Sequence, residues 1–401
     1  MLHQIQANVG AVLLVIAAFP GSEKILIMNV VFYPKICDFC KSFLARAVCG
    51  RGLLPVEPIP DSRKSLSMQI NSVFWLVILL GCLLSPAQTL AGGPLSVADS
   101  LNGKVVILDP GHGGTAATDS YRVGPSGERE EWVNLRVALL LRDLLEEAGA
   151  KVVLTRDSDT FVPLEARSQL ALESQGDLFV SIHHNATADP SVNFPIIYFH
   201  GAAMENQASV LLGEKIALAL RKHLFAGKGP YSLVSDHTIF SKSGASVLRG
   251  TYGMPAVIGE ATFFTHPKEE KRLKKEAYNR KEAVAYFEAI QAFFSEDMPP
   301  IVEKSLPLRL RPFEVFQEAE RMRPEALQWK ENYQEAKRLY KNGDAAARQQ
   351  ALSLLNLSVK AFPDSYLARD CHELRVAILE AAGKSEEAAM EALRVEAFYP
   401  R

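Results

Sequence analysis

The strongest constraint on the fold is a repeated alternation, between residues 103 and 294, of short apolar runs with longer amphipathic stretches. Runs rich in Val, Ile and Leu predict β-strands, and apolar residues at helical spacing predict α-helices. The predicted strands are 105–108, 151–155, 178–182, 195–199 and 256–259. The predicted helices are 132–148, 164–174, 205–224 and 268–294. This order predicts an α/β fold with a mainly parallel twisted sheet flanked by helices on both faces.

The first predicted strand ends abruptly in the sequence Asp109-Pro-Gly-His-Gly-Gly114. Pro110 and Gly111 stop the strand, and the later glycines allow a positive φ or a close approach of the backbone to a ligand. His112 therefore lies just past the carboxyl end of a strand, where open α/β sheets tend to bind ligands. Taken alone, the segment fits equally well a tight turn whose histidine is an ordinary polar residue.

Three further segments bring chemistry-bearing side chains to strand or helix ends. They are Glu128 to Leu135 at a helix start, Ser181 to Ala186 after the third strand, and Pro255 to Glu260 at the last strand. Zinc hydrolases need three His or carboxylate ligands and an open position for water, and these ligands often stand on different strands. Each segment alone has an ordinary structural explanation. An ordinary structural explanation is least satisfactory for Glu260, because a carboxylate at a buried strand end needs a partner or a metal.

Together these motifs resemble the zinc-dependent N-acetylmuramoyl-L-alanine amidases of bacterial cell-wall metabolism, with an amidase type 3 catalytic domain, over about residues 104 to 294. The motifs are Ile107 to Gly114, Glu130 to Leu135, Leu154 to Asp157, Ser181 to Ala186, and Pro255 to Glu260 with Phe263. The resemblance implies that Zn²⁺ is the cofactor and peptidoglycan the substrate. The bond cleaved would join N-acetylmuramic acid to L-alanine.

Carried over residue by residue, the resemblance implies that His112, Glu130 and His183 are the zinc ligands and that Glu260 is the catalytic glutamate. Glu130 is preferred to its neighbour because the family ligand stands four residues before the Asn of the Val-Asn-Leu motif. His183 directly follows Ser-Ile, but the family commonly has a small residue where this chain has His184. An exchange of ligand roles between the two histidines stays open.

Glu260 would take a proton from water activated by the zinc and return it to the leaving amine. Asn185 and Arg249 are weaker candidates for contacting substrate, and each could equally be a loop cap or a surface charge. A zinc peptidase acting on peptidoglycan would use the same four residues. A non-catalytic wall-binding protein is the other alternative, although such a protein would be expected to have lost a ligand or the catalytic acid.

The chain changes character after a Pro-containing linker at 297–313, and residues 314–401 are predicted to be helical throughout. The rhythm of helices and Gly or Pro turns loosely resembles about two tetratricopeptide repeats. Such a region would offer a surface for a protein activator or scaffold. A small helical bundle without a partner fits the pattern equally well. The catalytic domain is therefore predicted to span 103–296, with a second, all-α helical-hairpin domain after it.

Residues 1–67 show no useful periodicity and are interpreted as a poorly ordered or non-native extension. The pair Cys37 and Cys40 lacks the further ligands of a zinc site.

Residues 68–91 contain an apolar core followed by small residues, the order of a cleaved signal peptide. Cys82 partly resembles a lipidated residue, so membrane attachment is expected only if the segment is uncleaved or Cys82 is lipidated. We therefore expect export to the periplasm or cell envelope. A net charge of -2 implies no nucleic-acid partner.

Overall fold

The computed structural model describes residues 12–18, 25–31, 101–115, 122–305 and 310–400. The chain divides into two compact units, Met1–Thr89 and Leu90–Arg401. The predicted signal segment at 68–91, Cys82 and the Cys37 and Cys40 pair lie outside the described residues. Within the part of the chain that is described, every helix is too short or too polar to cross a bilayer.

In the first unit, strands β1 (Val12–Ala18) and β2 (Ile25–Val31) pair antiparallel, with Val12 opposite Val31. Sequence analysis predicts no regular element in this region. The strand β1 falls within an apolar run that includes several β-branched residues, which favour extended backbone.

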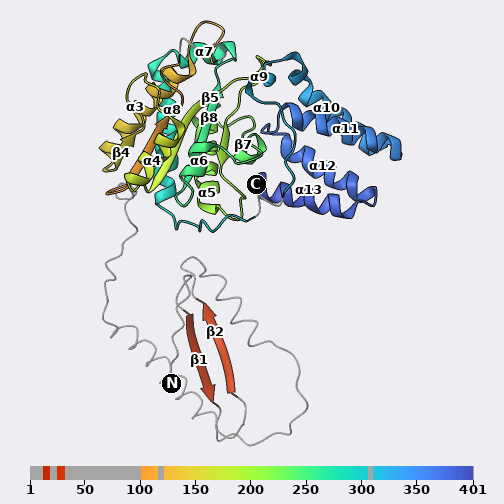
Figure 1. The fold of residues 1–401 in the computed structure, drawn as a ribbon. Coiled ribbons are helices and arrows are strands. Elements are labelled where there is room, and N and C mark those ends of the chain that lie inside the picture. The colour runs from red at the N-terminus through yellow and green to blue at the C-terminus, as the bar shows by residue number, and fades with distance from the viewer. Residues whose placement is uncertain (1–11, 19–24, 32–100, 116–121, 306–309, 401) are drawn as a thin grey trace, which may run out of the picture. The chain divides into compact units, whose positions relative to one another are not determined.

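The second unit is built on a sheet of six strands in the order β4-β3-β5-β8-β6-β7 (Figure 1). The strands are β3 (Val105–Pro110), β4 (Lys151–Leu154), β5 (Leu178–Asn185), β6 (Ile196–Phe199), β7 (Ser232–Ser235) and β8 (Ala256–Phe263). Neighbouring strands are parallel except β6 and β8, which are antiparallel. The predicted mainly parallel sheet is confirmed. The edge strand β7 is not predicted, because Ser232-Leu-Val-Ser235 is short and only half apolar.

Helices cover both faces of the sheet, as predicted. The helices of this part are α3 (Glu130–Glu147), α4 (Leu164–Glu173), α5 (Gln207–Leu224), α6 (Ser246–Gly250), α7 (Pro267–Leu273) and α8 (Glu276–Phe294), with a short 3₁₀ turn η2 (Asp236–Thr238) after β7. Helices α3, α5 and α8 pack together on one face, over a core that includes Val106, Val180 and Val257. Side chains that alternate with these, such as Ile107, Phe179 and Ile258, form a second core on the other face.

One predicted helix, 268–294, is in fact two. Helix α7 ends at Leu273, and α8 begins at Glu276. The break follows two buried carboxylates of α7 that bind distant segments: Glu270 accepts hydrogen bonds from the backbone of Ser126 and Glu128, and Glu269 accepts one from Asn193. A single straight helix would have to make these contacts of Glu269 and Glu270 and also pack the buried face of α8 against the core, with one axis direction for both.

The C-terminal region is helical, as predicted. It contains α9 (Glu318–Arg321), the 3₁₀ segment η4 (Pro324–Gln328), α10 (Trp329–Asn342), α11 (Ala345–Ala361), α12 (Ala368–Ala381) and α13 (Ser385–Phe398). Helix α10 packs on α11, α11 on α12, and α12 on α13, which is the neighbour-by-neighbour packing of helical hairpins. Asp344 caps α11 by accepting a hydrogen bond from the backbone of Ala347 at 3.0 Å. The tetratricopeptide likeness stays a prediction.

The helical region contributes side chains to the second core of the sheet. Phe362 makes ring contacts with Phe194 and Phe263 from the sheet part and with Trp329 from α10. Beside these rings, the Tyr198 hydroxyl of β6 donates to the carboxylate of Asp364. Burial and the charge of Asp364 raise the pKa of Tyr198 well above its ordinary value, so this hydroxyl stays a donor.

A buried ion pair in this junction leads to a stability prediction. Arg321 donates to the fully buried Asp364 at 2.8 Å. Replacing Asp364→Asn leaves the guanidinium buried without a counter-charge and should lower the free energy of unfolding by about 3–5 kcal/mol. Urea denaturation followed by circular dichroism measures this loss. The exposed pair Lys360 and Glu314 gives a matched control, because Glu314→Gln should change the unfolding free energy by less than about 1 kcal/mol.

Candidate functional site

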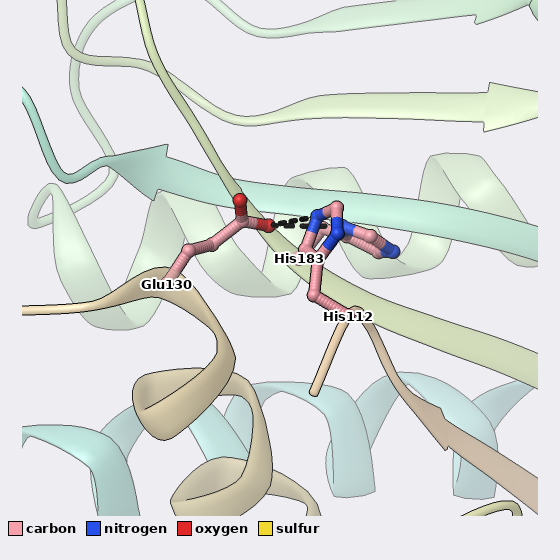
Figure 2. A group of neighbouring side chains, drawn as sticks. All are labelled: His112, Glu130 and His183. Atoms are coloured by element: carbon pink, nitrogen blue, oxygen red, sulfur yellow. Dashed lines mark hydrogen bonds and ion pairs between the residues drawn. The ribbon is translucent and has the colours of Figure 1, made fainter. Parts of the chain in front are cut away.

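Three side chains from different parts of the sheet unit meet at the carboxyl ends of β3 and β5 (Figure 2). The carboxylate oxygen Oε1 of Glu130 lies 3.1 Å from His112 Nε2 and 2.9 Å from His183 Nδ1. The two imidazole rings are 4.7 Å apart and nearly perpendicular. One donor atom from each of the three residues can be chosen so that all lie within 4.8 Å of one another. The structure therefore brings together all three predicted metal ligands.

The turn after β3 places His112 because its backbone takes conformations that few sequences allow. His112 itself has a φ of 59°, and Gly113 has a φ of 115°. A Cβ at Gly111 would lie 2.2 Å from the ring of His183, so only glycine lets the chain pass this close to the second histidine. The glycines thus have a steric reason in the packing of the site.

Glu130 is the first residue of α3, where the helix dipole favours a negative charge. The residue is 3 % exposed. Burial alone would raise the pKa of Glu130, but the adjacent His112 and His183 lower it well below its ordinary value. Burial lowers the pKa of His183 despite its hydrogen bond to Glu130, which favours the neutral imidazole. A carboxylate and a neutral imidazole are the protonation states that bind metals.

The structure separates the roles of the two adjacent histidines. His184 is buried, and both of its ring nitrogens are engaged away from the cluster: Nδ1 lies 2.8 Å from Asn134 Oδ1, and Nε2 lies 3.0 Å from Glu282 Oε2. Asn134 in turn donates to Glu130 Oε1 at 3.3 Å. His184 therefore supports the cluster through Asn134, while His183 contacts Glu130 directly.

Glu260 lies beside the cluster on the neighbouring strand. It is the pairing partner of His183 across β5 and β8, so the two side chains leave the sheet on the same face. Glu260 is half-buried, and its charge also contributes to the raised pKa of Tyr198, after burial and the charge of Asp364. A catalytic role for Glu260 stays a prediction.

A buried support beneath the cluster is not predicted from the sequence. Asp109, two residues before the first glycine of the turn, accepts from Arg167 Nη1 at 2.6 Å and from the hydroxyl of Ser181 at 2.6 Å. The Arg156 side chain donates to the carbonyls of Pro110 and Gly111. These contacts fix the ends of β3 and β5 together, and Arg156 belongs to a motif that carries the family resemblance. The role of Arg156 in holding the end of β3 is visible only from these three-dimensional contacts.

The two weaker candidates for substrate contact lie in different places. Asn185 is the last residue of β5, and its side chain accepts a hydrogen bond from the backbone of Ala186. Arg249 is on α6, where it donates to the carbonyls of Ser243 and Gly244. None of the interactions described for Arg249 involves His112, Glu130 or His183. Substrate contact by either residue stays a prediction.

The donor set suits a tetrahedral divalent ion of the zinc type, because two imidazoles and one carboxylate are common ligands of catalytic zinc. The three donors face one another, the carboxylate is buried, and the close approach at Gly111 leaves no room for a larger residue. The residues present therefore fit such an ion. When bound, such an ion would act as a Lewis acid towards an amide or ester carbonyl.

Comparisons with known proteins find relatives of the part of the chain that contains this site. The family model described as N-acetylmuramoyl-L-alanine amidase matches residues 106–292. The germination-specific N-acetylmuramoyl-L-alanine amidase of Bacillus subtilis is 30% identical over 219 residues, which cover 50% of this chain and 84% of that protein. The amidase AmiA of Escherichia coli is 29% identical, over 48% of this chain and 76% of that protein. Among solved structures, the amidase AmiC2 of Nostoc punctiforme is 28% identical with a TM-score of 0.42, covering 49% of this chain and 99% of that one.

Proposed function

The chain belongs to the N-acetylmuramoyl-L-alanine amidase family, and we propose that it works as a zinc enzyme in which His112, Glu130 and His183 hold the metal and Glu260 moves the proton. The protein is an amidase that hydrolyses the bond between N-acetylmuramic acid and L-alanine in peptidoglycan. The single observation that carries the metal proposal is the convergence of His112, Glu130 and His183, from the turn after β3, the start of α3 and β5, on one small volume.

When bound, zinc supplies a Lewis acid that polarises the amide carbonyl and makes water more acidic. The protein residues do the rest. Asn134 donates to Glu130 and to the carbonyl of Gly111, which orients the carboxylate ligand relative to the turn that carries His112. Such outer contacts fix ligand direction before the metal arrives.

Glu260 acts as general base and then general acid in this proposal. Its carboxylate takes a proton from the attacking water and returns it to the nitrogen of the leaving L-alanine. Pairing of β5 with β8 sets Glu260 opposite His183, so both side chains leave the sheet on the same face. Proton transfer by a positioned carboxylate typically contributes about 10²–10⁴-fold to the rate.

We also propose the domain limits and location. Residues 103–296 would form the catalytic domain and 314–401 a helical region that receives a protein activator or scaffold. The predicted signal peptide at 68–91 would direct the enzyme to the periplasm or cell envelope, where its substrate lies. Membrane attachment would follow only from an uncleaved segment or a lipidated Cys82.

Product analysis tests the bond that is cleaved. Digestion of purified sacculi should release intact stem peptides that begin with a free L-alanine amino group, measured by mass spectrometry. A peptidase using the same four residues would instead release fragments cut between amino acids of the stem. A wall-binding protein without activity would release nothing. Either of these last two outcomes would contradict the proposed reaction.

A further inference from the structure

A second group of His and Asp side chains, which are residue types that bind metals, lies at the opposite end of the same sheet. His200 directly follows β6, and Asp236 directly follows the neighbouring parallel strand β7. Because β6 runs antiparallel to β8, Phe199 pairs with Val257 at the start of β8, whereas Glu260 pairs with Ile196 at the start of β6. The carboxyl ends of β6 and β7 therefore meet at the sheet edge away from Glu260. Ligand sites tend to form where parallel strands end.

The donors of this second group are arranged like those of the amidase site. His200, Asp236 and His237 each offer a ligand atom, and these atoms all lie within 4.8 Å of one another. His200 Nδ1 is 2.8 Å from Asp236 Oδ2, and the two imidazole rings are 5.3 Å apart. Two imidazoles and one carboxylate are again the donor set that borderline divalent metals such as zinc prefer.

The carboxylate of Asp236 carries an oxygen that the described protein contacts do not satisfy. Its Oδ2 accepts from His200 and, at 2.7 Å, from the backbone of Ala245. Its Oδ1 is buried without a hydrogen-bond partner, and the whole residue is 0 % exposed. A buried carboxylate oxygen without a partner is costly unless a cation or a donor completes it. Asp236 therefore points to a missing positive group.

The surroundings are built closely around this carboxylate. Gly244 has a φ of 70°, and a Cβ there would lie 2.5 Å from the His200 ring and 2.6 Å from Asp236 Oδ2. His237 is half-buried, and one of its ring nitrogens donates to the backbone carbonyl of Ser241, which leaves the other ring nitrogen for a ligand. Its ring stacks on Phe398 of α13, at 5.8 Å and an angle of 10°. The group thus lies where the sheet meets the C-terminal helix.

One internal cation already approaches the group. The ammonium of Lys304 lies 3.1 Å from His200 Nε2 and 4.6 Å from the centre of the Tyr252 ring. The carboxylate of Glu205 holds the backbone of the next residue, Ser305, which keeps Lys304 in place. Arg249 is a second positive charge close to Lys304, and it donates to the backbone carbonyl of Gly244. Burial lowers the pKa of Lys304, and the charge of Asp236 opposes that lowering, so the ammonium and the carboxylate interact electrostatically.

We propose that His200, Asp236 and His237 form a second, structural site for a divalent transition metal, Zn²⁺ in the first instance, and that Lys304 supplies the positive charge when this site is empty. The ion would bind the free oxygen of Asp236 and fix η2 against the sheet. Because His237 also stacks on Phe398, a bound ion would stabilise the junction between the sheet and α13. This site is independent of the amidase reaction.

Zinc counting in a protein without the first site tests the proposal. In the full chain carrying His112→Ala and His183→Ala, equilibrium dialysis against Zn²⁺ with elemental analysis should find one bound ion, and zinc should raise the melting temperature. Adding His237→Phe keeps an aromatic ring against Phe398 but removes a ligand, so binding should weaken by about 100-fold or more. The protein without substitutions should bind two ions.

Lys304 provides a variant with the opposite expected effect. Lys304→Met removes the competing ammonium and should tighten zinc binding at this site by about tenfold or more, since a unit charge a few ångströms away is worth more than 1.4 kcal/mol. Lys242→Met removes the same charge from an exposed position in the nearby loop and should leave the affinity almost unchanged. The proposal is overturned if the protein without the first site binds no zinc even with Lys304→Met, or if His237→Phe leaves its affinity the same.

Discussion

Replacing Glu260→Gln should lower the rate of peptidoglycan hydrolysis by about 10²–10⁴-fold while the protein keeps its zinc. The amide has nearly the shape of the carboxylate, but it does not accept a proton from water. Release of stem peptides from purified sacculi measures the rate, and elemental analysis measures the metal. Because Glu260 pairs with His183 inside the sheet, the substitution should leave the strand register unchanged.

The matched control is Glu165→Gln, which makes the same chemical change at an exposed position in the first turn of α4. It should retain the full rate. If Glu260→Gln also kept the full rate, Glu260 would not be the general base. If it lost zinc together with activity, the result would assign Glu260 to the metal and not to proton transfer.

The second large effect is expected from the adjacent histidines. His183→Ala removes a direct contact of Glu130 and should cost one equivalent of zinc together with measurable activity. His184→Ala should keep the full zinc count at saturating metal but weaken the affinity by about 10–100-fold, because the His184 side chain acts on Glu130 through Asn134, and its direct contact with Glu130 is a backbone N–H that the substitution keeps. Zinc titration of each purified variant separates the two results.

A folding control is needed for the second variant, since removing His184 leaves the buried Glu282 without its partner. Adding Glu282→Gln to His184→Ala removes that buried charge and should recover part of the thermal stability without changing the zinc count. The ligand assignment would be reversed if His184→Ala, and not His183→Ala, lost the metal.

The sequence predicts most of the fold because its strands and helices have clear periodicity. Runs such as Val105 to Leu108 are apolar throughout, as strands buried on both faces are, and the glycine turn after them needs no tertiary information. The reversal of β6 and the edge strand β7 could not be predicted in the same way. A strand of four residues carries no sign of its direction, which is set by the loops and helices around it.

The candidate site also contains some residues that could be predicted from the sequence and others that could not. His112, Glu130 and His183 stand in motifs with a recognisable pattern, so their meeting could be expected. The supporting contacts could not, because Asp109 with Arg167, and His184 with Glu282, join residues far apart in the chain. The choice between His183 and His184 depends on which way each side chain leaves β5. Alternation along a strand sends neighbours to opposite faces, but only the positions of α3 and α8 decide which face holds the cluster.

The shared core between the sheet and the C-terminal helices limits how this enzyme can be recombined. A catalytic segment cut off at the predicted linker would present Phe194, Tyr198 and Phe263 to water, where Phe362 and Asp364 now cover them. Such a fragment would be prone to aggregate, although its catalytic residues would all be present. A chimera with the helical region of another amidase would fold only if that region supplied the same aromatic contacts to the sheet. The catalytic and helical parts therefore cannot be exchanged independently.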